Sequence, residues 1–193
     1  MRPKKDAQGN DTDQTEWGSK IADQFHFAWI NGTESDETID AKTLVSTSLL
    51  ALQATHKRGL FVNGNAGKDT ITGSDYSDNI QGGAGDDLID GGTQIARENQ
   101  RGQDVFEVRL TATDISQANA LMSRVSVLPS DKDGYQWMVV QKNADGSVSE
   151  TDHLKNIESV NISVNNAQNQ WLAGKWINTA ITVGEVRVNI NNP

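Results

Sequence analysis

The sequence predicts a mainly β protein: a short parallel β-roll, or β-solenoid, fused to a β-sheet or sandwich section, with one or two helices. Two observations predict this fold class. Glycine and aspartate recur with a nine-residue period between Gly64 and Gly92, which is the pattern of a stacked repeat. After residue 104, short alternating or apolar segments of strand length follow one another. The expected organisation is a polar linker over 1–15 and one domain over 16–193, with repeats over 31–108 and a β-rich part over 109–193.

Three units of nine residues make up the clearest part of the repeat. They read GNAGKDTIT, GSDYSDNIQ and GGAGDDLID from Gly64 to Asp90, and each has glycine first, aspartate sixth and isoleucine eighth. The glycine-rich positions permit a tight turn, and the last three residues form a short strand whose isoleucine points inward. A flexible linker has no reason to keep this phase. The aspartates are Asp69, Asp78 and Asp87, and the isoleucines are Ile71, Ile80 and Ile89.

Two units close one coil of such a solenoid, so turns on the same side come from alternate units and Asp69 is expected to stack on Asp87. Stacked carboxylates repel each other unless a cation lies between them. Carboxylate and carbonyl oxygens without thiolate or imidazole favour Ca²⁺, so the sequence predicts several calcium ions. The predicted metal-binding residues are Asp69, Asp78, Asp87, Asp104, Gly64, Ala66, Gly73, Asp75, Gly82, Ala84, Gly91 and Thr93.

A degenerate copy of the unit precedes the clear ones. GTESDETID, at residues 32–40, keeps glycine first and Ile39 eighth. It has Glu37 where the other units have aspartate. We therefore expect an additional turn of the solenoid upstream of Gly64.

A fourth unit follows the clear ones and is interrupted. It begins at Gly91, is broken by residues 94–101, and resumes with Asp104 sixth and Phe106 eighth. Asp104 is then the expected stacking partner of Asp78. An inserted surface loop is often a tolerated excursion. This one leaves the solenoid beside a predicted calcium site, which makes it the first candidate for ligand contact.

Two helices are expected outside the repeats. Apolar residues at helical spacing predict one near Thr43–His56, capped by Asp40 or Thr43. TDISQANALMSRV predicts the second, capped by Thr113 or Asp114. Strands are expected in DVFEVRLTA, YQWMVVQK, GSVSETD, SVNISV and AITVGEVRVNI, with a hairpin turn at Asn143–Gly146 and Trp137, Trp171 and Trp176 in the core or at its rim.

Composition and the absence of certain motifs exclude several classes of function. The net charge of -9 argues against nucleic acid and anionic lipid as partners. The chain has no cysteine, which excludes disulfides and thiolate metal sites. No stretch has the length of a membrane span, and no Sec signal peptide is recognisable. His26, His56 and His153 are isolated and neither H-E-x-x-H nor G-x-S-x-G occurs, so we expect no enzyme.

The repeat resembles a known family. G-G-x-G-x-D-x-U-x is the calcium-binding nonapeptide of RTX (repeats-in-toxin) proteins. A second segment resembles the one that closes RTX arrays in secreted bacterial proteins, and its residues are Leu154, Asn156, Ile157, Glu158 and Val160. A short array with insertions, between a helix and a β-rich part, is most similar to the calcium-dependent peptide-binding domain of bacterial RTX adhesins.

This resemblance implies a monomeric module of a larger, type I-secreted adhesin at the bacterial cell surface, with roles in cell adhesion and biofilms. In that family, a short peptide or protein C-terminus is bound through a calcium-coordinated carboxylate. The residues expected to contact such a ligand are Arg97, Gln100, Arg101 and Gln103. Two alternatives stay open: a calcium-dependent sugar-binding module, and a structural block whose calcium only drives folding after secretion.

Overall fold

The computed structural model describes residues 28–44, 59–93, 103–179 and 190–191. This part of the chain is mainly β, as predicted. Its strands are β1 (Ala28–Asn31), β2 (Thr38–Asp40), β3 (Leu60–Ala66), β4 (Thr70–Thr72), β5 (Asn79–Ala84), β6 (Leu88–Asp90), β7 (Val105–Thr111), β8 (Val125–Pro129), β9 (Trp137–Lys142), β10 (Val148–Lys155), β11 (Ser159–Asn165), β12 (Trp171–Asn178) and β13 (Ile190–Asn191). Its helices are α2 (Ala41–Leu44) and α4 (Ile115–Met122). Neither described helix has the length and apolarity that crossing a membrane requires.

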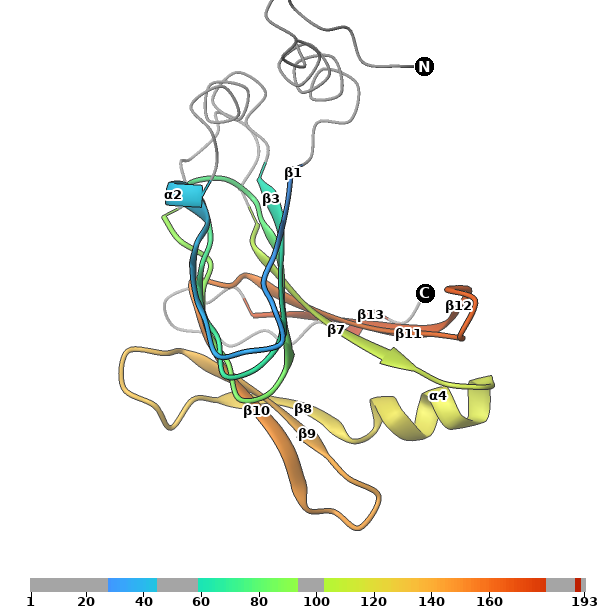
Figure 1. Ribbon diagram of the computed structural model, residues 1–193. Helices are drawn as coiled ribbons and strands as arrows, with labels where there is room; N and C mark the ends of the chain where they lie inside the picture. The colour runs from blue at the N-terminus through green and yellow to red at the C-terminus, as the bar shows by residue number, and fades with distance from the viewer. Residues whose placement is uncertain (1–27, 45–58, 94–102, 180–189, 192–193) are drawn as a thin grey trace, which may run out of the picture.

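The repeats form a parallel β-roll whose two walls are facing sheets (Figure 1). One sheet has the strand order β1-β3-β5-β7-β11-β12-β13, and the other has the order β2-β4-β6-β10-β9-β8. Each coil contributes one strand to each sheet, with the glycine-rich turn between them. The parallel register joins Phe61 to Asn79 and Thr70 to Leu88, which is two nonapeptides along the chain. The predicted two-unit coil is therefore confirmed.

The narrow core consists of two rows of stacked apolar side chains. One row lies on the sheet that contains β4, and it comprises Ile39, Ile71, Ile89 and Leu154. The other row comprises Ile30, Val62, Ile80, Phe106 and Val160. All of them except the half-buried Ile30 are buried. Each fully buried side chain of this size contributes about 1.5–3 kcal/mol, so the eighth position of each unit holds the roll closed.

The β-rich part continues the two sheets of the roll. Strand β11 pairs in parallel with β7 and antiparallel with β12. Strand β10 pairs in parallel with β6 and antiparallel with β9, which β8 joins at the edge. The predicted β-sheet section is thus present, and it shares both of its sheets with the repeats (Figure 1).

The flanking elements agree with the predicted pattern where they are described. Helix α2 covers the start of the first predicted helix, and residues 45–58 lie outside the described part. Helix α4 has Asp114 as its N-cap, whose Oδ1 accepts a 2.9 Å hydrogen bond from Gln117 N–H. The hairpin turn at Asn143–Gly146 joins β9 to β10, with Asn143 N–H donating to Ser147 C=O at 2.9 Å.

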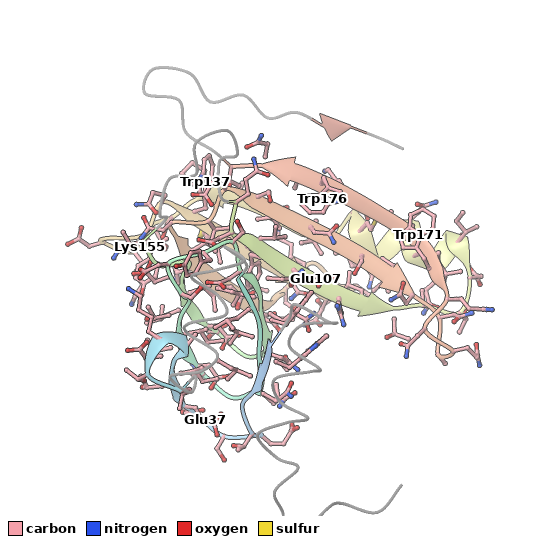
Figure 2. All side chains as sticks on the ribbon, turned by 90° about the horizontal axis from the view of Figure 1, so that it is seen from above. Glu37, Glu107, Trp137, Lys155, Trp171 and Trp176 are labelled. Atoms are coloured by element: carbon pink, nitrogen blue, oxygen red, sulfur yellow. The ribbon has the colours of Figure 1, made fainter. Side chains whose placement is uncertain are left out.

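The three tryptophans of the β-rich part differ in burial. Trp137 is half-buried against the core, and its Nε1–H donates to the Thr179 carbonyl at 3.2 Å. Trp171 and Trp176 are exposed on β12 (Figure 2). Trp137 is therefore the one that packs at the rim of the main core.

The fourth coil of the roll is open. Strands β3 and β5 stay paired as far as Ala66 and Ala84, but β5 and β7 pair only at Asn79–Val105 and Ile80–Phe106. Beyond Phe106, β7 leaves the roll and follows β11 (Figure 1). The chain then runs through α4, β8 and β9 before β10 brings it back to the roll. An insertion of residues 111–149 therefore lies in the turn of this coil.

Candidate metal centre

A ladder of carboxylates runs along one edge of the roll, and we call Glu37, Asp69, Asp87 and Asp152 the first ladder. Glu37 N–H donates to Asp69 Oδ1 at 2.9 Å, and Asp69 N–H donates to Asp87 Oδ1 at 2.9 Å. Asp87 N–H in turn donates to Asp152 Oδ1 at 3.2 Å. The predicted stacking of Asp69 on Asp87 is present, and the degenerate copy contributes Glu37 to the same row.

A second ladder runs along the opposite edge and comprises Asp78, Asp104 and Glu158. Leu60 N–H donates to Asp78 Oδ1 at 2.6 Å, and Asp78 N–H donates to Asp104 Oδ1 at 2.7 Å. Asp104 N–H donates to Glu158 Oε2 at 2.7 Å. The predicted contact between Asp78 and Asp104 is therefore present, and Glu158 of the closing segment ends the row.

The turns leave room for a cation beside these carboxylates. Asp69 Oδ2 and Asp87 Oδ2 are buried and accept no hydrogen bond. A Cβ atom added to Gly64 would lie 2.3 Å from Asp69 Oδ2 and 2.3 Å from the Gly82 carbonyl oxygen. Glycine at the first position thus leaves a space bordered by a carboxylate oxygen and a backbone carbonyl of the next coil. These are the donors that Ca²⁺ prefers, so the residues present fit calcium.

The buried carboxylates of the ladders also need a positive charge nearby to be stable in their ionised form. Burial raises the pKa of Asp78 and of Asp87 to about 6. Neither carboxylate takes part in an ion pair of the described residues. Buried anions without a cationic partner are costly, and bound calcium supplies the positive charge that favours their ionised form.

The calcium ligands of such turns are not a cluster of acidic side chains. Within the described residues, no group of three or more His, Cys, Asp or Glu side chains is arranged to hold a metal. A turn of this kind offers one or two carboxylates, and backbone carbonyls supply the other oxygens. The first-position glycines, which provide that access, are Gly64, Gly73, Gly82 and Gly91.

The remaining predicted site residues are placed unevenly. Ala66 and Ala84 lie opposite each other at the ends of β3 and β5. The Asp75 carboxylate pairs with Lys42, and Thr93 is exposed. Gln103 is exposed, and its N–H donates to Ser77 Oγ at 3.1 Å. Arg97, Gln100 and Arg101 lie outside the described residues, so their predicted ligand contacts stay predictions.

Two acidic residues of the ladder edge were not predicted from the sequence: Glu150 and Asp152. The register pairs His153 with Leu88 and Leu154 with Ile89, which puts Asp152 at the sixth position of a hidden repeat. The signal was present, because Asp152 and Leu154 are two residues apart, as in every clear unit. It was missed because the first half of that repeat lies before the insertion.

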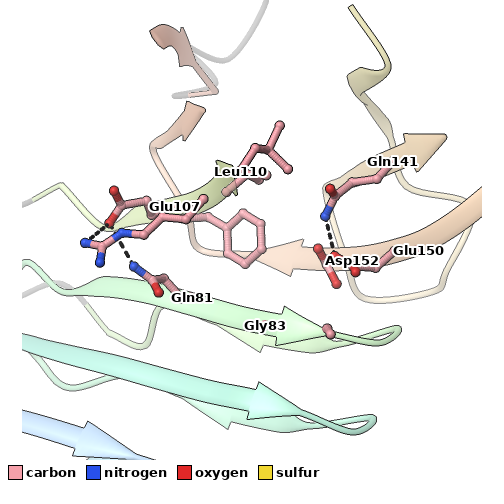
Figure 3. Close-up of a pocket in the computed structure, with 11 residues that line it drawn as sticks. Gln81, Gly83, Glu107, Leu110, Gln141, Glu150 and Asp152 are labelled. Atoms are coloured by element: carbon pink, nitrogen blue, oxygen red, sulfur yellow. Dashed lines mark hydrogen bonds and ion pairs between the residues drawn. The ribbon is translucent and has the colours of Figure 1, made fainter. Parts of the chain in front are cut away.

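A pocket of about 350 Å³ lies where the fourth coil is open (Figure 3). On one wall, Glu107 accepts hydrogen bonds from Arg109 Nη2 at 3.0 Å and from Gln81 Nε2 at 3.1 Å. Glu150 and Asp152 lie on the opposite wall, where Gln141 Nε2 donates to Glu150 Oε1. The two walls thus differ in the pairing of their acidic groups. Glu107 forms an ion pair with Arg109, whereas Glu150 and Asp152 form none within the described residues.

Burial acts on the carboxyl groups of the two walls with different results. At Glu107, burial raises the pKa, but hydrogen bonds from Arg109 and Gln81 outweigh it and leave the pKa lowered. At Glu150, burial raises the pKa to about 7. Burial, together with the neighbouring Glu150 charge, raises the pKa of Asp152 well above its ordinary value. The acidic groups of the pocket that have no ion-pair partner among the described residues therefore lie on the wall formed by β10.

Comparison with known families agrees with this geometry. The model of the RTX calcium-binding nonapeptide repeat, in four copies, matches residues 63–95. Ca²⁺ is therefore the cofactor of these repeats, with several ions bound. Proteins with such repeats are typically secreted, and the repeats themselves are typically non-catalytic. No curated protein matches the chain.

Proposed function

We propose that the chain is a non-catalytic, calcium-dependent ligand-binding module of a secreted bacterial RTX adhesin, and that its ligand is the C-terminal end of a peptide. The observation that carries this proposal is the pocket at the open fourth coil. It adjoins the first ladder, so folding of the calcium turns and formation of the pocket are coupled. A volume of about 350 Å³ is near the lower end of ligand pockets, which suits the last one or two residues of a peptide.

The pocket offers complementary chemistry to a peptide terminus. Arg109 on one wall presents a guanidinium, which binds carboxylates through paired hydrogen bonds. Phe106 and Leu110 give apolar surface for a terminal side chain. Calcium, when bound in the adjacent turn, accepts carboxylate oxygens. A terminal carboxylate therefore has two cationic partners within reach of one pocket, whereas an amidated terminus offers them only one neutral carbonyl oxygen.

The proposed setting is the bacterial cell surface after type I secretion, where the module takes part in cell adhesion and biofilms. Low cytosolic calcium leaves the ladders without their counter-charge. Extracellular calcium then folds them, at affinities of about 10⁻⁴–10⁻³ M for modules of this kind. Folding and ligand binding thus begin in the same compartment.

A peptide screen tests the proposal. Peptides with random terminal residues are prepared as free acids and as amides, and their binding is measured in calcium and in EDTA. We expect binding only by the free acids in calcium, and at least tenfold weaker binding to an Arg109→Gln variant. Lys132→Gln, an exposed change outside the pocket, is the matched control.

Each other outcome of the screen selects an alternative. Equal binding of acids and amides would contradict the carboxylate contact. Calcium-dependent binding of free sugars instead of peptides identifies a sugar-binding module. Calcium-dependent folding without binding of either class identifies a structural block.

A further inference from the structure

We propose that Glu150 and Asp152 form an additional divalent-cation site, built from the split turn of the fourth coil. Both residues lie outside the segment 63–95 that matches the repeat family. The site deepens the proposed function, because it lies in the wall of the same pocket, and it rests on that function only for the identity of the ligand.

The hidden repeat supplies the first step of the argument. The interstrand register places Val108, Arg109 and Leu110 at the first three turn positions of the fourth coil, and the insertion 111–149 follows them. Residues 150–152 return at positions four to six. Thr151 N–H donates to Asp86 Oδ1 at 2.9 Å, as Lys68 N–H donates to Asp36 Oδ1 at 2.8 Å two coils earlier. The two halves of one calcium turn are therefore present but separated by the pocket.

Glu150 replaces a backbone carbonyl of the missing turn. In the second coil, Gly67 N–H donates to the Ala84 carbonyl of the next coil at 2.9 Å. The equivalent Gly85 N–H has no such carbonyl and donates to Glu150 Oε2 at 3.4 Å. A carboxylate thus stands where regular turns present a carbonyl oxygen, and it can donate an oxygen to a cation in the same way.

Asp152 is the second candidate ligand. It is only 1% exposed, and its side chain lines the pocket. Its Oδ1 accepts from Asp87 N–H, and within the described residues no hydrogen bond reaches its other oxygen. Keeping the carboxylate of so deeply buried a residue ionised without a counter-charge is costly. Facing the pocket, it is poised to bind a cation there.

The described cationic side chains Lys68 and Arg109 are already paired with other carboxylates. Lys68 pairs with Asp86 at 3.3 Å and Arg109 pairs with Glu107 at 3.0 Å. None of the ion pairs in the described part of the chain includes Glu150 or Asp152. Oxygen donors without imidazole or thiolate select a hard divalent cation, and Ca²⁺ tolerates such irregular oxygen sites.

The coordination shell of this ion is incomplete from the protein side. A Cβ added to Gly64 would meet a carbonyl of the next coil, whereas the three atoms nearest to a Cβ on Gly82 all belong to Asp87. The third turn therefore lacks the close carbonyl of a following turn. Two carboxylates fill only part of the six to eight positions of calcium. The rest face the pocket, where water or a ligand oxygen completes them.

Counting bound calcium tests the inference on the full chain. Equilibrium dialysis with radioactive calcium at saturation gives ions per chain for the wild type, for Glu150→Gln and Asp152→Asn, and for the double variant. Both amides retain an acceptor for the Gly85 and Asp87 N–H groups, so the fold is preserved. We expect the double variant to bind one ion fewer while its calcium-induced circular dichroism change stays intact. Glu107→Gln, on the opposite wall, is the matched control and should bind as many ions as the wild type.

The outcomes separate this inference from the proposed function. An unchanged ion count in the double variant would overturn the site, whatever the peptide result. If the double variant fails to fold in calcium, the number of ions bound by Glu150→Gln alone is compared with the wild type. An unchanged number would then overturn the site. One ion fewer with peptide binding intact would support the site and contradict calcium as the partner of the peptide carboxylate.

Discussion

The backbone N–H of Asp87 donates a 3.2 Å hydrogen bond to the carboxylate of Asp152, a residue 65 positions further along the chain. This contact makes the last regular coil of the roll depend on β10, which arrives only after the whole insertion. The calcium-binding repeats and the β-rich part are therefore one cooperative structure at this edge. A substitution in the first ladder should accordingly lower the stability of the β-rich part as well as that of the repeats.

Removing one charge from the first ladder should weaken the response to calcium. Asp87→Asn keeps the shape of the side chain but removes the charge of the buried Oδ2, which has no other partner. We expect the difference between the Tm in calcium and in EDTA to fall by at least half. Asp133→Asn, an exposed change of the same kind outside the repeats, should leave that difference unchanged. Equal calcium stabilisation of Asp87→Asn and wild type would argue against Asp87 as a ligand.

Filling the space beside the ladder should have a similar effect without any change of charge. A Cβ in Gly82→Ala would lie 2.1 Å from Asp87 Oδ2 and must displace it. Overpacking of this kind costs about 1–3 kcal/mol, so the calcium midpoint by circular dichroism should rise about tenfold. Ser116→Ala, an exposed change on helix α4, should leave the midpoint close to the wild-type value.

The inward row of the core should be sensitive to truncation. Ile80 is fully buried between Val62 and Phe106 of the neighbouring coils. Ile80→Ala should lower the free energy of unfolding by about 2–5 kcal/mol in saturating calcium, as measured by chemical denaturation. The control is Val148→Ala, at a 57% exposed position, which should change stability by less than about 0.5 kcal/mol.

Acid should weaken calcium binding. Burial raises the pKa of Asp78 and Asp87 to about 6 and that of Glu150 to about 7. Because calcium needs the ionised carboxylates, the calcium midpoint should rise between pH 7 and pH 5, by about tenfold for Asp78 and for Asp87 and by about fiftyfold for Glu150. Calcium titrations at pH 5, 6 and 7 measure this slope. A midpoint independent of pH would mean that these groups are ionised without the ion.

In EDTA the pH dependence should have the opposite sign. A raised pKa means that the folded chain takes up protons more readily than the unfolded chain. The stability contributed by these groups is therefore present near pH 4 and is lost as pH rises through 6 to 7. Chemical denaturation in EDTA across this range should show the free energy of unfolding falling. A rise over the same range would contradict the raised pKa values.

The regular part of the site could be predicted because its information is local. Asp69, Asp78 and Asp87 lie at the sixth position of consecutive nonapeptides, so a count of residues places them in turns. Even the interrupted unit could be followed to Asp104, since both halves resemble the repeat. Glu150 and Asp152 could not be placed by counting, because residues 111–149 separate them from the strand that begins their coil.

The sequence by itself determined the two-unit coil, the inward isoleucines and the stacked carboxylates, because a nine-residue period with glycine first, aspartate sixth and isoleucine eighth has one regular way to bury its apolar row. Only the tertiary structure decided where that regularity ends. Strand β7 pairs with β5 at two residues and then leaves with β11. That divergence opens the fourth turn and leaves the carboxylates of β10 facing a pocket. The sequence could not determine it, because the strand pairing that causes it joins segments far apart in the chain.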